Sequence, residues 1–245
     1  MGDVPALTTG RTAGRVARTL GVTATAGIAA YWWPALSSVM PTLRAPLGIV
    51  DHIADPSRIA LTFDDGPHPE GTPAVLEWLA RADARATFFL VGEQVERWPE
   101  LAVAVAAAGH TVGLHAYQHD LLPRLGPWRL RRDLDRAALV LREVTGREMR
   151  LSRAPHGVPT TSDLLLARRD GRTLVHWSRW GKDWMARATP ESIASLVVEH
   201  LRGGDIVLLH DADHYSAPGS WRRTLAALPA IREAAEQRGL GFAAL

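Results

Sequence analysis

The stretch Arg58-Ile59-Ala60-Leu61-Thr62-Phe63-Asp64-Asp65-Gly66-Pro67 carries the clearest sign of the fold. Its first part, Arg58 to Phe63, has the length and apolar character of a buried β-strand. Two adjacent carboxylates then close the strand, and a Gly-Pro pair turns the chain. Neighbouring side chains of an extended chain point in different directions. One carboxylate can therefore bind a metal while the other faces a substrate as a base.

Short apolar runs alternate with helix-like segments along the rest of the chain. Further strands are expected at Ala86 to Val91, Thr111 to His115, Met149 to Arg153, Thr173 to Trp177, Asp205 to His210 and Leu240 to Ala244. Helices are expected at Pro73 to Ala82, Gly92 to Ala108, Trp128 to Glu143, Ser162 to Arg169, Pro190 to Leu201 and Trp221 to Gln237, with Thr72 and Thr189 as caps of two of them. Such alternation predicts an α/β domain in which crossover helices join parallel strands into an open sheet or a barrel.

Composition limits the classes of protein open to this chain. Its 245 residues suffice for one sizeable α/β domain, and 47% hydrophobic with 22% charged residues excludes disorder of the whole chain. The net charge is only +2, Lys182 is the single lysine, and no basic run with interleaved aromatics indicates a nucleic-acid partner. Because the chain has no cysteine, a zinc site must use histidine and carboxylate ligands.

The N-terminal residues have the layout of a signal or membrane-anchor segment. The stretch from Thr19 to Leu43 carries no formal charge, and its Trp32-Trp33 pair suits a membrane interface. The basic flank before it consists of three arginines, Arg11, Arg15 and Arg18. A proline and several hydroxyl side chains dilute the signal, so a helix packed on the domain is the alternative. We predict an apolar helical segment over residues 1–48, acting as signal or anchor, and a catalytic domain over residues 55–245, membrane-anchored or secreted outside the cytoplasm.

Two histidines four residues apart, His115 and His119, close the third expected strand. On a helical turn this spacing places both rings on one face. Two imidazoles and one carboxylate form a three-ligand site that leaves room for water, which is the layout of a catalytic zinc site. Since the spacing alone is common, this interpretation depends on the other motifs.

Polar side chains close three more strands, where active sites of parallel barrels form. In Arg153-Ala154-Pro155-His156-Gly157, a permanently charged guanidinium can orient a carboxylate. The fourth group holds one aspartate and three tryptophans suited to lining a sugar site, namely Asp183, Trp177, Trp180 and Trp184. The apolar strand before His210 places that histidine as a general acid, and the loop Asp211 to Ser216 after it is a candidate for substrate contact.

These five groups, in this order, resemble the motifs of the polysaccharide deacetylase family, the NodB-homology carbohydrate esterases of family 4. The matching residues are Thr62 to Pro67, His115 and His119, Arg153 with Pro155 and Gly157, Asp183 with Trp184, and Leu208 to Asp211. The resemblance covers about residues 58 to 245. It implies a distorted (β/α)7 barrel, similar to a TIM barrel, with which the seven expected strands agree.

By this resemblance Asp64 is the general base, held by Arg153, and His210 is the general acid, tuned or oriented by Asp183. The implied metal ligands are Asp65, His115 and His119. The implied substrate-binding residues are Trp184, Leu208 and Pro155. The residue after the first metal histidine is usually Ser or Thr in the family but is Ala116 here.

Two other departures are Ala154, where a second proline is common, and Trp180, where many members carry an aspartate. Without a hydroxyl at residue 116, the metal site has one supporting group fewer. Ala154 in place of proline changes the rigidity of its loop. Trp180 in place of aspartate affects the role that the resemblance implies for Asp183. Every implied metal ligand and acid–base residue is nevertheless present.

The resemblance implies a metal-dependent hydrolase that removes acetyl groups, N-acetyl above all, from a cell-wall or chitin-like polysaccharide with metal-activated water. The ligands predict a divalent metal, Zn²⁺ by expectation, although Co²⁺ or another first-row metal fits them. The expected partner is an acetylated polysaccharide or oligosaccharide, with membrane association through the N-terminal segment and no nucleic acid.

Three alternatives stay open at this point. The chain can be a non-catalytic carbohydrate-binding protein on the same fold, or a deacylase of a membrane lipid-linked sugar. The third is a two-carboxylate glycosidase. Adjacent Asp64 and Asp65 argue against that pair, because glycosidase carboxylates flank the bond from separate positions.

Overall fold

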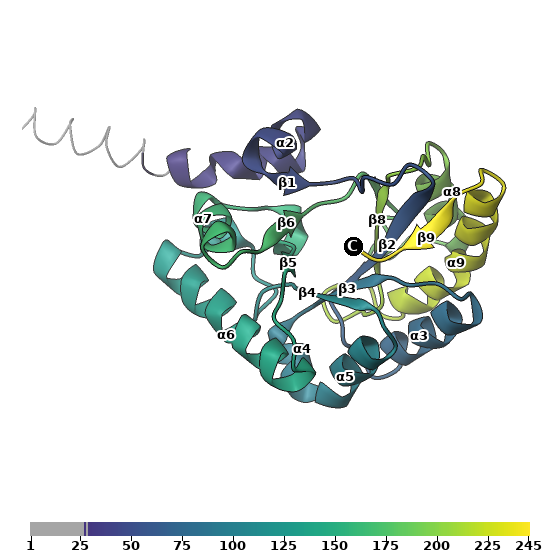
Figure 1. The fold of residues 1–245 in the computed structure, drawn as a ribbon, viewed down its shortest axis with the longest axis horizontal. Helices are drawn as coiled ribbons and strands as arrows, with labels where there is room; N and C mark the ends of the chain where they lie inside the picture. Colours follow the sequence, from purple (N-terminus) through teal and green to yellow (C-terminus); the bar gives the residue numbers. More distant parts are fainter. Residues whose placement is uncertain (1–26, 28) are drawn as a thin grey trace, which may run out of the picture.

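A curled sheet of parallel strands organises the computed structural model, which describes residue 27 and residues 29–245 (Figure 1). Across the sheet the strand order is β1-β6-β5-β4-β3-β2-β8-β7, and β9 also pairs with β2. The strands are β1 Ile49–Val50, β2 Arg58–Asp64, β3 Thr87–Leu90, β4 Thr111–Leu114, β5 Leu151–Ser152, β6 Thr173–Val175, β7 Arg179–Trp180, β8 Ile206–His210 and β9 Gly241–Ala243. Within the described residues no ladder joins β1 to β7. The sheet is therefore a barrel that stays open at one side, which confirms the predicted barrel-like α/β fold.

Helices surround this sheet on its outer face (Figure 1). The α-helices are α2 Arg44–Leu47, α3 Gly71–Arg81, α4 Gly92–Arg97, α5 Pro99–Ala107, α6 Pro127–Thr145, α7 Thr161–Arg169, α8 Pro190–Val198 and α9 Ser220–Glu236. Short 3₁₀ helices are η1 Trp33–Ser38, η2 Pro41–Leu43, η3 Leu122–Arg124 and η4 Pro155–Gly157. Each long helix connects one parallel strand to another, as a parallel sheet requires.

Local chemistry explains where the helices differ from the sequence expectations. The single helix expected from Gly92 to Ala108 is wrong, because the chain divides into α4 and α5 at Trp98. Pro99 disfavours helical backbone at the residue before it and cannot donate to the preceding turn. The predicted cap Thr189 is confirmed by a capping box with Ser192. The predicted cap Thr72 is wrong, since α3 begins earlier, at Gly71.

The strands at the edges of the sheet were the least predictable. Neither β1 nor β7 was expected as a strand, and each has only two residues. The predicted strand Met149 to Arg153 shrinks to Leu151–Ser152. Such short segments have too few residues to show an alternation of apolar and polar side chains.

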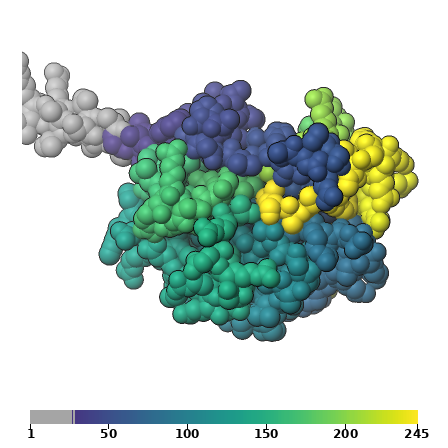
Figure 2. Space-filling model, in the orientation of Figure 1, coloured from purple at the N-terminus to yellow at the C-terminus, as the bar shows by residue number. Residues whose placement is uncertain are grey.

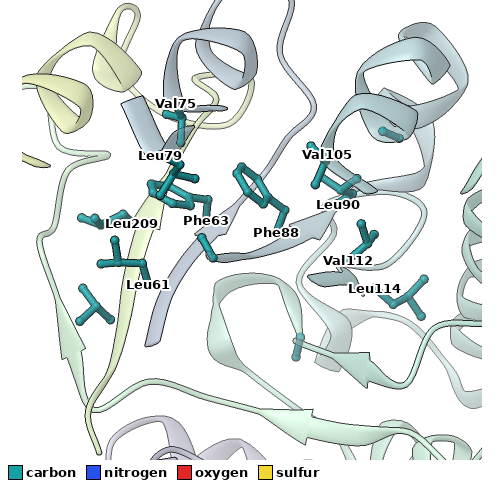
Figure 3. Packing of buried hydrophobic residues seen from close by; sticks show 14 of the residues in the cluster. Leu61, Phe63, Val75, Leu79, Phe88, Leu90, Val105, Val112, Leu114 and Leu209 are labelled. Carbon is teal, nitrogen blue, oxygen red and sulfur yellow. The ribbon is translucent and has the colours of Figure 1, made fainter. Parts of the chain in front are cut away.

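Side chains of β2 alternate between two environments, and this alternation positions the site. Leu61 and Phe63 point toward the helices (Figure 3), and together with Ile59 they belong to the large core cluster. Thr62 and Asp64 fall on the other face, toward the barrel interior, because successive side chains of a strand point to opposite sides. A one-residue register shift would bury the carboxylate among the helices.

The chain before β2 packs on the domain. Leu47 and Ile49 form a small apolar cluster with α7 and β6 residues Leu164, Ala167 and Leu174. Arg44 is buried and donates to the Asp51 carboxylate at 2.9 Å and to the Trp177 carbonyl at 2.8 Å. Figure 2 shows this purple segment lying against the green surface of α7.

Most of the predicted N-terminal segment, including Arg11, Arg15 and Arg18, lies outside the described residues. Among residue 27 and residues 29–245, we find no helix with the length and apolar character that crossing a membrane requires.

Phe88 on β3 tests the importance of the core between sheet and helices. Its fully buried ring stacks on Phe63 at 5.2 Å between centroids (Figure 3). We expect Phe88→Ala to lower the free energy of unfolding by about 3–5 kcal/mol, through lost burial and the cavity left behind. Urea denaturation followed by circular dichroism measures the change. The exposed Leu196→Ala is the control, and an equal loss in both variants would contradict the assignment of this core.

Candidate active site

The C-terminal ends of the parallel strands surround a cavity of about 250 Å³. Its walls come from loops that follow β2, β4, β5, β6, β7 and β8. The lining residues are Asp64, Asp65, His115, His119, His156, Gly157, Trp177, Trp180, Trp184, Leu208, His210 and Tyr215. The side chains predicted from separate motifs are therefore brought together at the edge of the barrel where parallel barrels form their active sites.

Asp64, the last residue of β2, is tied to a buried arginine. Nη1 of Arg153 donates to Oδ1 of Asp64 at 2.7 Å and to the Thr62 hydroxyl at 2.8 Å. Both members of the ion pair are at most 2% exposed. Burial lowers the pKa of Arg153, and the neighbouring Asp64 opposes that change. Arg153 thus fixes the carboxylate in one orientation inside the barrel.

Asp65, His115 and His119 direct three ligand atoms toward a common point. Oδ1 of Asp65 lies 3.4 Å from Nε2 of His115 and 3.2 Å from Nε2 of His119. Ligand atoms about 2.1 Å from a tetrahedral metal are separated by roughly 3.4 Å, so this spacing fits one ion. This oxygen is buried and has no hydrogen-bond partner among the described residues. The donor set, two imidazoles and a carboxylate, fits a divalent metal.

Charge also suits this group to a cation. Burial raises the pKa of Asp65, but the imidazoles of His115 and His119 outweigh burial and hold that pKa well below its usual range. The carboxylate is therefore ionised. Nδ1 of His115 donates to the Arg153 carbonyl at 2.9 Å, so Nε2 is the ring nitrogen that is available to a metal.

His119 is oriented by aromatic contacts. Its ring stacks on Tyr215 at 4.4 Å with an interplanar angle of 13°, and its other neighbour His156 meets it edge-on at 4.4 Å. The Tyr215 hydroxyl is itself anchored on α4, where it donates to Glu93 and accepts from Gln94 at 2.8 Å. Burial lowers the pKa of His156 to about 4, so its imidazole is neutral.

His210 faces this group from the end of β8, beside Asp64 in the strand register. Nδ1 of His210 lies 2.9 Å from Oδ1 of the fully buried Asp183, and Oδ2 of Asp183 accepts from the Thr224 hydroxyl at 2.7 Å. Burial alone lowers the pKa of His210, but Asp183 and the carboxylates of Asp65 and Asp64 raise it to about 10. The imidazole is thus held protonated, with Nε2 turned toward Asp65 at 3.9 Å.

Apolar side chains form the remaining wall. Trp184 meets His210 edge-on at 5.5 Å, and Trp180 bridges Trp184 and Trp177 at 5.5 and 5.9 Å between ring centroids. Leu208 also lines the cavity. Pro155, the third predicted substrate-binding residue, is buried at the start of η4 and is not among the lining residues.

Left-handed backbone concentrates at this site. Of the five non-glycine residues with positive φ in the described chain, four belong to the loops that build the cavity. These are Asp65, Ala116, His156 and Lys182, with φ between 51° and 75°. Such conformations cost of order 1–3 kcal/mol each and persist where the surrounding contacts enforce them.

The motifs did not single out every residue that lines the cavity. Tyr215 lies in the loop after His210 that was a candidate for substrate contact, but nothing in the sequence indicates that its ring covers His119. Gly157 belongs to the Arg153 motif, whereas His156 lies within the same loop without a signal of its own. At Gly157, with φ +67°, an added Cβ would lie 2.3 Å from the Trp177 ring, so only glycine fits.

The three residues that depart from the family pattern lie in or beside the site. Ala116 adopts a φ of 62°, and its carbonyl accepts from the Gly92 amide at 3.0 Å. Ala154 is buried in the core. Trp180 stands at the end of β7 and lines the cavity, while Asp183 keeps its bond to His210.

Comparison with known proteins identifies relatives from one family. The family described as Polysaccharide deacetylase matches residues 52–175. A chitooligosaccharide deacetylase of Azorhizobium caulinodans is 34% identical over 193 residues, which cover 76% of this chain and 91% of that protein. A peptidoglycan-N-acetylglucosamine deacetylase of Bacillus cereus is 37% identical over 187 residues, covering 75% of this chain and 84% of that protein.

Solved structures show the same fold. A crystal structure of a peptidoglycan N-acetylglucosamine deacetylase matches with a TM-score of 0.74 and 27% identity, covering 80% of this chain and 90% of that one. A family 4 carbohydrate esterase from Streptomyces lividans, in complex with acetate, matches with a TM-score of 0.68 and 29% identity, covering 77% and 93%. The chain therefore belongs to the polysaccharide deacetylase family, whose named enzymes among these relatives remove acetyl groups from polysaccharides.

Proposed function

We propose that this chain removes N-acetyl groups from a glycan containing N-acetylglucosamine, of the peptidoglycan or chitin type. The observation that supports the proposal most directly is the convergence of Asp65, His115 and His119, with Asp64 and His210 beside them. The similar proteins of known name act on chitooligosaccharides and peptidoglycan, which indicates the class of substrate.

In this proposal Asp65, His115 and His119 hold the metal, and Zn²⁺ is the ion best suited to two imidazoles and a carboxylate. When bound, the metal supplies Lewis acidity, which polarises the acetyl carbonyl and makes water a stronger nucleophile. Co²⁺ or another first-row ion fits the same ligands.

Two residues move protons in the proposed reaction. Asp64, held by Arg153, accepts a proton from water as it attacks the acetyl carbon. His210 donates a proton to the leaving nitrogen of the sugar, and Asp183 keeps its imidazole protonated and oriented for that step. Acetate and a free amine on the sugar are the products.

The apolar wall accounts for binding of the substrate. Leu208 and Trp184 are positioned to receive the acetyl methyl, and Trp180, 39% exposed, offers an aromatic face to a sugar ring. Pro155 acts indirectly in this proposal, by shaping the η4 turn that carries His156 and Gly157.

We also propose that residues 55–245 form the deacetylase domain and that residues 1–48 act as a signal or anchor segment, so that the enzyme works outside the cytoplasm. The uncharged stretch from Thr19 to Leu43 behind a basic flank supports this placement. Its last residues, from Trp33 onward, connect the segment directly to the folded domain.

Asp65→Asn tests the metal site. The variant is expected to bind Zn²⁺ at least about a hundredfold more weakly and to lose acetate release, because a neutral amide oxygen replaces the only anionic ligand. Calorimetric metal titration and acetate release from chitin oligomers and peptidoglycan measure the two effects. Asp163→Asn, which alters an equally buried carboxylate outside the cavity, is the matched control. Unchanged metal affinity in Asp65→Asn would contradict the ligand assignment.

Tyr215→Leu tests the support of His119. Loss of the stacked ring frees the imidazole to rotate, so metal affinity is expected to fall by roughly tenfold to a hundredfold. Tyr215→Phe keeps the ring and removes only the hydroxyl bonds to Glu93 and Gln94, so its affinity should stay much closer to that of the unaltered protein. Equal affinities in the two variants would show that stacking does not position His119.

Asp183→Asn tests the general acid. Because His210 acts in its protonated form, activity falls as the pH rises through the pKa of His210. Asp183 raises that pKa, so its neutralisation lowers it and moves the alkaline limb of kcat/KM to lower pH, by about one unit or more. A pH profile of acetate release measures the limb. If the alkaline limb of Asp183→Asn stays at the pH found for the unaltered protein, the limb reports the titration of a group other than His210.

A further inference from the structure

Large apolar side chains are exposed along the segment that leads into the domain. They are Trp32 and Trp33, each 44% exposed, Leu36 at 49%, Val39 at 78% and Met40 at 46%. No charged residue occurs between Thr19 and Leu43 in the sequence. Apolar side chains that cluster at a surface indicate a partner that covers them.

This apolar segment lies on the same side of the molecule as the cavity. Its Ser38 hydroxyl donates to the carbonyl of Gly157, and Gly157 lines the cavity. The hydroxyl of Tyr31, the residue before this segment, donates to the carbonyl of Leu125. Gly157 and Leu125 belong to the loops that follow β5 and β4, so both contacts are at the C-terminal ends of the strands.

The chain around Leu125 adds positive charge beside the apolar segment. Residues 121–132 contain four arginines and no acidic residue, and all four are exposed: Arg124, Arg129, Arg131 and Arg132. Arg129 and Arg131 pair with Asp120 and Asp135, whereas Arg124 and Arg132 have no carboxylate within 4 Å among the described residues. Trp128, 69% exposed, lies within this run, and the Arg132 guanidinium is 5.9 Å from its ring.

We propose that the apolar segment 32–40 and the basic run 121–132 together form a docking face for an anionic lipid bilayer. Tryptophans and aliphatic side chains enter the interfacial layer, while arginines without carboxylate partners contact anionic headgroups. In the sequence, the apolar segment is the end of the uncharged, tryptophan-containing stretch that follows the basic flank. Binding to a soluble protein would require neither the uncharged stretch nor the basic flank. The bilayer accounts for both features.

Docking in this way places the mouth of the cavity at the membrane surface. This inference about the substrate rests on the proposed deacetylation. The orientation favours acetylated glycans that are attached to a membrane lipid, or glycan chains held close to the membrane. A glycan far from the bilayer would reach the cavity only after the domain detaches.

The absence of cysteine allows a direct test on the full chain. Single cysteines at Leu36, Met40 and Trp128 are labelled with an environment-sensitive fluorophore, and Val103→Cys and Leu196→Cys serve as controls at exposed apolar positions on α5 and α8. The protein is reconstituted with vesicles of phosphatidylglycerol and phosphatidylcholine that contain a lipid-borne quencher. Quenching several-fold stronger at residues 36, 40 and 128 than at 103 and 196 is the expected result.

The charge requirement is tested in the same vesicles. Arg124→Gln with Arg132→Gln should weaken docking roughly fivefold for each arginine, so that quenching at residues 36 and 40 falls toward the control value. Equal quenching at all five positions would overturn the proposal. The proposal would also be overturned if the labels are shielded from solvent in the absence of lipid. Shielding by a second copy of the chain would indicate a protein interface, and shielding by chitin oligomers would indicate a glycan interface. Acetate release from soluble chitin oligomers is measured in parallel, so failure of docking is distinguished from failure of the deacetylase assignment.

Discussion

The buried ion pair between Arg153 and Asp64 is the constraint on which the rest of the site depends. One residue at the end of β5 fixes the carboxylate of β2 through its side chain and the imidazole of His115 through its carbonyl. Taking two charges out of water is unfavourable, and breaking such a pair from one side costs about 3–5 kcal/mol. The Thr62 hydroxyl and the His176 carbonyl occupy further guanidinium donors, which helps to offset that desolvation. Asp64 and His115, the proposed base and one of the proposed metal ligands, are thus both held by Arg153, so a shift of one residue affects the other.

The barrel makes this arrangement possible because the side chains of β2 divide cleanly between two environments. Apolar residues at every second position anchor the strand under the helices, and the remaining positions carry polar groups inward at the open end. Thr62 is one of these inward residues, and its hydroxyl accepts a hydrogen bond from Nη1 of Arg153. The packed layer sets the strand register, and the register sets where the carboxylates lie.

Sequence alone predicted the parts of the molecule whose signals are local. Strand β2 combines an apolar run with a turn motif, and α8 begins with a capping box, so both follow from neighbouring residues. By contrast, β1 and β7 are defined only by pairing with distant strands. The stacking of Tyr215 on His119 joins side chains 96 positions apart, and no local pattern encodes it. The motif residues of the site are close together in space, as expected, because each motif ends a strand of one parallel sheet. The contacts that orient them depend on packing that a single sequence does not reveal.

The left-handed residues of the active-site loops bear on how this enzyme can be improved. Asp65, Ala116, His156 and Lys182 hold conformations that glycine would adopt more readily, so the loops store strain that the barrel must balance. Substitutions that relieve this backbone strain at residues 116 and 156 are therefore attractive for raising thermostability. Those substitutions would loosen the backbone that presents His115 and His119. Resistance to heat and catalytic competence therefore compete at the same few residues, and engineering for one should start from the helices instead.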